Sequence, residues 1–151
     1  MKRWQRWTFN ALAFVVSATG FAYLWMKYFV EAADAFAVVN HPWQVPALSL
    51  HVIASPGFIF VFGIVLDAHV MKKLGASALP NRRSGYLSLG TLALMVLSGY
   101  LLQVTSDAAW LRALVIAHVA AGAVFSLTYG AHLVVSARLG RRQNSAVREV
   151  A

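Results

Sequence analysis

One apolar stretch, Ala47–Met71, constrains the fold most strongly, because it is long enough to cross a bilayer as a helix and carries a histidine near each end. His51 and His69 are eighteen positions apart. At roughly 100° and ~1.5 Å per residue, this spacing places both imidazoles on one helix face, about 27 Å apart along the axis. An ionisable residue inside a membrane span is a functional candidate by default, so we take both histidines as candidate site residues.

The composition is that of a membrane protein. Hydrophobic residues make up 60% of the chain, charged residues only 12%, and the mean hydropathy is +0.64. The net charge of +8 lies in short runs between apolar segments, so it indicates membrane topology and predicts no nucleic-acid partner. The sequence contains no cysteine, which excludes disulfides, thiolate metal sites, thioether-attached haem and iron–sulfur ligation by this chain.

Four apolar spans follow one another along the chain, at about 7–29, 47–71, 86–104 and 110–137. Each is near the ~20 residues that a bilayer requires, and a backbone in hydrocarbon must satisfy its own hydrogen bonds. We therefore predict an all-α protein, an integral membrane four-helix up-down bundle in a single domain over residues 1–151. The first span is too long for a cleaved signal peptide, so we expect it to be retained.

Two further expectations concern internal repeats and the C-terminal tail. We find no internal repeat among the spans. The polar, charged tail after Gly140 is expected to be mobile.

The basic residues indicate the orientation. Lysines and arginines precede the first span, separate the second from the third and follow the fourth, whereas only Lys27 and Arg112 lie on the other side. The positive-inside rule then places both termini in the cytoplasm. Tryptophans at the expected boundaries match the aromatic belts of membrane proteins.

The fourth span carries a second pair of histidines, His118 and His132, fourteen positions apart and again close to one face. In an up-down bundle the second and fourth helices run parallel. His51 and His118 are then expected near the outer side of the membrane, and His69 and His132 near the inner side. The sequence thus predicts two histidine pairs stacked across the bundle.

Two facing imidazoles suit haem, whose low-spin iron takes one axial ligand on each face of the ring. Zinc prefers four ligands in a tetrahedron and fits two histidines poorly. A single membrane histidine is more often a packed, hydrogen-bonded residue, but two matching pairs favour ligation. We therefore predict two non-covalent, bis-histidine haem b groups, with these four histidines as the metal ligands.

A macrocycle between helices also needs small neighbours and apolar walls. Small residues include Gly20 with Ala13 and Ser17 on the first span, Gly90, Ser98 and Gly99 on the third, and Gly57 and Gly122 near the outer histidines. Aromatic residues near the histidine faces are Phe58, Phe62, Phe125 and Tyr129. Taken alone, the small residues are better explained by ordinary close packing of membrane helices, and core filling explains the aromatic residues equally well.

Two other ionisable residues have open roles. His41 lies outside the spans beside Pro42, as a loop residue or as a group that handles protons at an outer quinone pocket. Asp67 is the only acid inside a span and points roughly opposite to His69. It is either an interfacial acid paired with a cation such as Lys72 or a route for proton uptake.

The segments NHPWQVPALSLHVIASPG, GIVLDAHV, SGYLLQVTSDAAWLRALVIAH and YGAHLVV resemble the small four-helix, di-haem b-type cytochromes of bacterial membranes. This family includes cytochrome b subunits of quinone-linked oxidoreductases. The resemblance covers about residues 7–137 and implies that the four histidines are axial ligands. It also implies a multi-pass location in the bacterial inner membrane and electron transfer between the quinone pool and a redox partner.

The leading functional hypothesis is a membrane electron carrier. No constellation of nucleophile, base and orienting group is visible, so we predict no bond-breaking chemistry by this chain. A chain this small, without a soluble redox domain, is expected to work in a larger complex or with a redox partner protein. The alternatives are a permease that uses the histidines for metal or other ions, and a structural membrane anchor whose histidines only pack.

Overall fold

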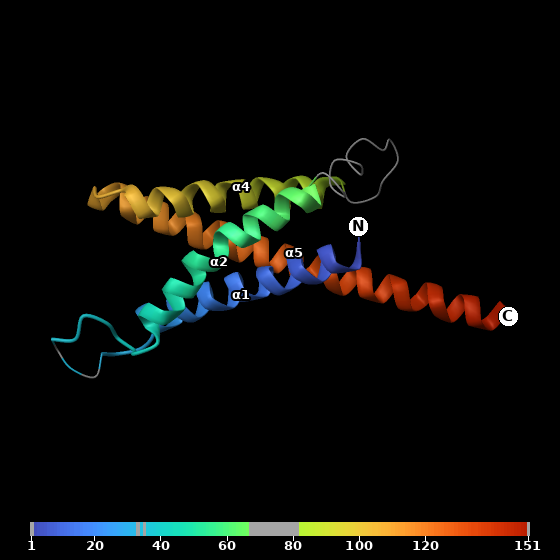
Figure 1. The fold of residues 1–151 in the computed structure, drawn as a ribbon, viewed down its shortest axis with the longest axis horizontal. Helices are drawn as coiled ribbons and strands as arrows, with labels where there is room; N and C mark the ends of the chain where they lie inside the picture. Colours follow the sequence, from blue (N-terminus) through green and yellow to red (C-terminus); the bar gives the residue numbers. More distant parts are fainter. Residues whose placement is uncertain (1, 33, 35, 67–81, 151) are drawn as a thin grey trace. The chain divides into compact units, whose positions relative to one another are not determined.

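The computed structural model describes residues 2–32, 34, 36–66 and 82–150. Within these residues the chain is helical and contains no strand (Figure 1). The helices are α1 (Arg3–Tyr28), α2 (Gln44–Val65), α4 (Arg82–Val104) and α5 (Ala108–Val150). The chain divides into two compact units, Met1–Leu79 and Pro80–Ala151. The first contains α1 packed against α2, and the second contains α4 packed against α5.

Three of these helices are long and apolar enough to cross a membrane. They are α1, α2 and the segment Ala108–Val135 of α5. The apolar part of α4, Leu89–Val104, is shorter. The predicted all-helical fold is confirmed for the described residues, and the end of the expected second span, from Asp67 onwards, lies outside them.

The core of the first unit follows the helical period. Phe9, Ala13 and Val16 are buried on α1, at intervals of four and three residues that place them on one face. The Phe9 ring stacks against Phe58 of α2 with 5.2 Å between centroids, and lies 6.2 Å from Phe62. Aromatic contacts of this kind add to the stability that burial supplies.

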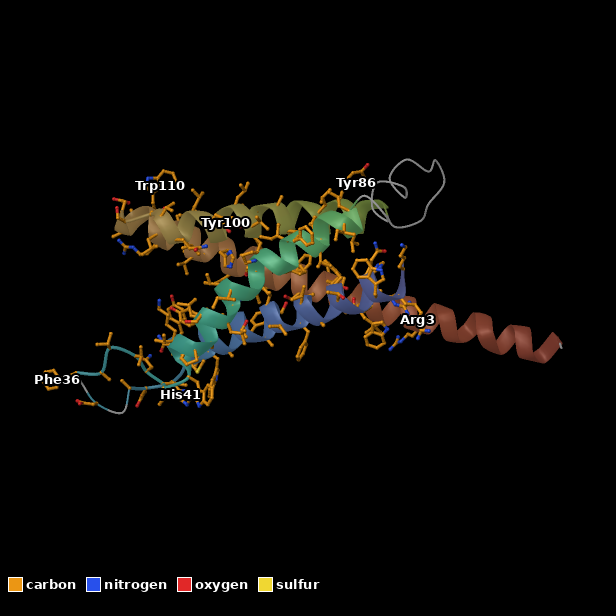
Figure 2. All side chains as sticks on the ribbon, in the orientation of Figure 1. Arg3, Phe36, His41, Tyr86, Tyr100 and Trp110 are labelled. Atoms are coloured by element: carbon orange, nitrogen blue, oxygen red, sulfur yellow. The ribbon has the colours of Figure 1, made fainter. Side chains whose placement is uncertain are left out.

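A fifteen-residue connection joins α1 to α2 at residues 29–43. Asn40 ties its end to both helices, because its side-chain Nδ2 donates to the Lys27 carbonyl at 2.9 Å and its backbone N–H donates to Gln44 Oε1 at 3.1 Å. Figure 2 shows Phe36 at the far end of the connection and His41 close to the helix ends. The base of the connection is therefore held by hydrogen bonds that its sequence supplies.

The second unit turns much more sharply, with only residues 105–107 between α4 and α5. Asp107 caps α5: its Oδ1 accepts hydrogen bonds from the backbone N–H groups of Ala109 at 3.0 Å and Trp110 at 2.9 Å. An aspartate at this position satisfies N–H groups that have no partner within the helix, and its charge suits the helix N-terminus.

The described residues of the tail after Gly140 are helical, because α5 continues to Val150, and the mobility of the tail stays a prediction. With 43 residues it is about 65 Å long at ~1.5 Å per residue, well beyond the thickness of a bilayer. Polarity alone led to that expectation. Arginine, glutamine and alanine are good helix formers, and no proline follows Gly140, so the backbone continues as a helix.

The cap at Asp107 leads to a prediction about stability. Replacing it in Asp107→Ala leaves the backbone N–H groups of Ala109 and Trp110 without their acceptor. We expect the free energy of unfolding to fall by about 1 kcal/mol, measured by denaturation of the detergent-solubilised protein. Asp107→Ser keeps a capping oxygen and is expected to lose much less; equal losses in the two variants would contradict the capping role.

Candidate functional site

The His51 ring packs over a glycine of the neighbouring helix and forms a hydrogen bond with a backbone carbonyl of that helix. It is half-buried on α2, and its Nδ1 lies 2.9 Å from the carbonyl oxygen of Val16 on α1. The ring lies directly over Gly20, where a Cβ atom would be 3.0 Å from His51 Cε1 and 3.1 Å from Nδ1. In a helix the carbonyl of residue i points toward residue i+4. The absence of a side chain at Gly20 therefore gives the imidazole access to the Val16 carbonyl.

His118 has the same setting in the second unit. It is half-buried on α5, and its Nδ1 lies 2.9 Å from the carbonyl oxygen of Met95 on α4. The ring lies over Gly99, where a Cβ atom would be 3.0 Å from Cε1 and 3.4 Å from Nδ1. Ser98 Oγ lies 3.1 Å from the same Nδ1. Here too the glycine follows the acceptor carbonyl by four residues.

The first helices of the two units match beyond the glycine. A hydroxyl precedes each glycine: Thr19 Oγ1 donates to the carbonyls of Val15 at 2.7 Å and Val16 at 3.2 Å. Ser98 Oγ lies within hydrogen-bond distance of the equivalent carbonyls of α4, those of Met95 and Leu94, three and four residues back. We call each set of acceptor carbonyl, hydroxyl, glycine and histidine a half-site; the first is Val16, Thr19, Gly20 and His51, and the second is Met95, Ser98, Gly99 and His118.

The second helices also match, which corrects the expectation of no internal repeat. Residues 51–63 read HVIASPGFIFVFG and residues 118–130 read HVAAGAVFSLTYG. Both segments have a histidine followed, after six residues, by phenylalanine, and then, after three more, by an aromatic residue and glycine. The sequence therefore contained a signal for the repeat. It was missed because the two units have connections of different length, so no single offset aligns both helices.

The acceptors determine where each imidazole carries its proton. A backbone carbonyl can only accept a hydrogen bond, so Nδ1 of His51 and of His118 must be the donor. In the neutral ring the lone pair is then on Nε2. Histidines that ligate metals almost always donate the second ring N–H to a carbonyl or carboxylate in this way, which fixes the tautomer and the ring orientation. Both half-sites thus present histidines in the form that a metal ligand requires.

The predicted aromatic residues follow these histidines by about two and three turns along the same helices. Phe58 and Phe125, at equivalent positions of the repeat, are only 2% and 5% exposed. Phe125 stacks on Tyr129 with 5.7 Å between ring centroids and 2° between the ring planes. Gly122 is in looser surroundings than Gly20: its nearest contact for an added Cβ is the Met95 sulfur at 3.6 Å, an ordinary van der Waals distance.

The other predicted ionisable residues are in different settings. His69 and Asp67 lie outside the described residues. His132 is exposed on α5, and in the repeat it is equivalent to Val65. His41 accepts a hydrogen bond from the backbone N–H of Trp43 at 3.1 Å, as expected of a loop residue. Among the described residues, no group of three or more His, Asp or Glu side chains is placed to hold a metal ion.

Comparison of the chain with protein-family models, with curated proteins and with solved structures finds no match.

Alanine substitutions at glycines inside and outside the half-sites are predicted to change the stability of the protein in opposite directions. In Gly20→Ala and Gly99→Ala the new Cβ pushes the imidazole away from its carbonyl, so we expect a lower melting temperature. Gly63 and Gly130, which also match in the repeat, have no atom within 4 Å of an added Cβ. At these positions alanine is expected to stabilise the helix by roughly 0.5–1 kcal/mol.

Thermal denaturation in one detergent compares the four variants. Nitrogen-15 NMR of the histidine side chains reports the tautomer, and we expect protonated Nδ1 at His51 and His118. Stabilisation by Gly20→Ala and Gly99→Ala, or protonation of Nε2 instead, would contradict the geometry.

Proposed function

We propose that this protein is a b-type membrane cytochrome in which His51 and His118 are the axial ligands of one haem iron. The single observation that carries the proposal is the duplicated half-site, which supplies two imidazoles in equivalent settings. A haem iron has two equivalent axial positions, whereas a tetrahedral zinc needs four ligands. Histidine nitrogen is a common axial ligand, and both rings are in the tautomer that leaves Nε2 as the ligand atom.

Each residue of a half-site has a defined task in this proposal. The carbonyls of Val16 and Met95 hold the rings by hydrogen bonds of 2.9 Å, so the rings do not have to be ordered when the cofactor binds. Gly20 and Gly99 allow each ring to lie against the neighbouring helix. Phe58 and Phe125, which are buried about two turns further along the same helices, would help to keep water from the site, and this influences the redox potential. Haem, when bound, supplies one-electron redox chemistry, and the protein supplies ligation, burial and orientation.

The inner pair, His69 and His132, stays a prediction for a second haem b. If both sites are filled, the chain carries electrons across the membrane between its two faces. Because the chain resembles cytochrome b subunits, we propose that it transfers electrons between the quinone pool and a redox partner protein or larger complex.

We also propose that the chain is a multi-pass protein of the bacterial inner membrane. The three helices of membrane-crossing length and the high mean hydropathy support membrane insertion. The distribution of lysine and arginine supports cytoplasmic termini.

The haem content of the purified protein tests the proposal. Protein from haem-replete cells is expected to be coloured, with a Soret band and the reduced-minus-oxidised spectrum of a bis-histidine haem b. His51→Ala and His118→Ala are each expected to remove the same haem, because each leaves the iron with one axial ligand. His41→Ala is the control, because the His41 ring accepts a hydrogen bond from Trp43 within the loop, and the haem content of this variant is expected to be unchanged.

A colourless protein from such cells would reject the cytochrome. If that protein instead carried metal ions across liposome membranes, the histidine-based permease would replace it. If it showed neither property, the structural anchor would remain.

The second haem has its own test. We expect about two haems per chain, and loss of one of them in both His69→Ala and His132→Ala, with the His51–His118 haem retained. A ratio of one haem per chain that neither variant changes would contradict the second haem and would mean that the chain binds haem at His51 and His118 alone.

A further inference from the structure

Ser98 is a buried hydroxyl that touches one of the two ligand histidines. Its side chain is only 2% exposed, on the face of α4 that carries the second half-site. Its Oγ lies 3.1 Å from Nδ1 of His118, 2.7 Å from the carbonyl oxygen of Leu94 and 3.1 Å from that of Met95. A single hydroxyl therefore joins the imidazole to two carbonyls of the helix backbone.

The direction of these bonds follows from the acceptors. Nδ1 of His118 must carry a proton, because it is bonded to the Met95 carbonyl at 2.9 Å. Ser98 Oγ then accepts from that same N–H, which is shared between two oxygens. The hydroxyl proton goes to a backbone carbonyl, of which Leu94 is the nearer. Two oxygen acceptors, themselves 3.1 Å apart, are thus within hydrogen-bond distance of the same imidazole N–H.

We propose that Ser98 is a positioning residue that orients His118 and lowers the redox potential of the iron bound there, an inference that rests on the proposed cytochrome. Acceptors on the outer nitrogen raise the basicity of a ligand imidazole. A more basic ligand stabilises ferric iron, the more positive state, relative to the ferrous state formed by one-electron reduction. Ser98 adds a second acceptor to the one that Met95 supplies.

The repeat suggests the conservative replacement. Thr19, equivalent to Ser98, makes the same two hydrogen bonds to its own helix, at 2.7 and 3.2 Å. The fold therefore already uses threonine in this half-site position. Ser98→Thr is expected to keep the hydroxyl and its bonds, whereas Ser98→Ala removes them and leaves Met95 as the acceptor.

Thr128 of α5, a half-buried residue, offers a control for the loss of a hydroxyl that bonds back to its own helix. Its Oγ1 bonds the carbonyls of Val124 at 2.8 Å and Phe125 at 3.1 Å, the same pattern three and four residues back. Thr128 belongs to neither half-site. Thr128→Ala therefore loses similar intrahelical bonds and leaves the contact between Ser98 and His118 in place.

The experiment compares the full-length haem protein with these three variants by redox titration and by the EPR spectrum of the ferric form. Ser98→Ala is expected to raise the midpoint potential of the His51–His118 haem and to change its EPR g values, while binding the same amount of haem. Ser98→Thr is expected to restore both properties, and Thr128→Ala to leave them unchanged. Nitrogen-15 NMR of the haem-free full chain is expected to show a shift of the His118 Nδ1 signal in Ser98→Ala alone.

The outcomes separate the two proposals. A coloured protein whose potential, g values and His118 signal do not respond to Ser98→Ala overturns the role of Ser98 and leaves the cytochrome intact. An equal response to Thr128→Ala overturns it as well. A colourless wild-type protein overturns the cytochrome and, with it, the redox role of Ser98; a changed His118 signal would then report only a structural bond.

Discussion

The hydrogen bond from a histidine Nδ1 to a backbone carbonyl of the neighbouring helix is the interaction on which both units depend. An imidazole in an apolar helical hairpin needs a partner, because a polar group buried without one destabilises the fold by roughly 1–3 kcal/mol. Carbonyls inside a helix are usually covered by the side chain four residues later. Glycine removes that cover at Gly20 and Gly99, so the glycine, the carbonyl and the histidine act as one structural element.

This element occurs twice, and the duplication is the main structural argument for function. Each half-site presents its imidazole in the same tautomer, and a buried phenylalanine follows that histidine at the same spacing along the helix. Two equivalent ligands suit a metal centre with two equivalent axial positions. Our proposal of a bis-histidine haem uses this equivalence. The same reasoning does not extend to the inner histidines, because His132 is not at the position of a half-site histidine in the repeat.

Much of the fold followed from the sequence because the constraints on apolar spans are severe. Both ends of α1 and α4 and the starts of α2 and α5 lie within a few residues of the expected spans, since apolar runs of this length favour hydrogen bonds within the helix. The helical tail after Gly140 was not predicted, because the apolar pattern that marks a span is absent there. The repeat was also missed, since insertions in the connection at residues 29–43 change the spacing between otherwise similar helices.

By itself, the sequence determined that the part of the chain described by the structure is helical and roughly where its apolar segments begin. It also marked Gly20, Ser98 and Gly99 as small residues suited to close packing. Only the tertiary structure decided that Val16 and Met95 supply the acceptors. Every residue has a backbone carbonyl, so the sequence does not mark which one accepts the hydrogen bond. The choice depends on how the two helices of a unit are rotated and shifted against each other, which is set by the packing of whole helix faces.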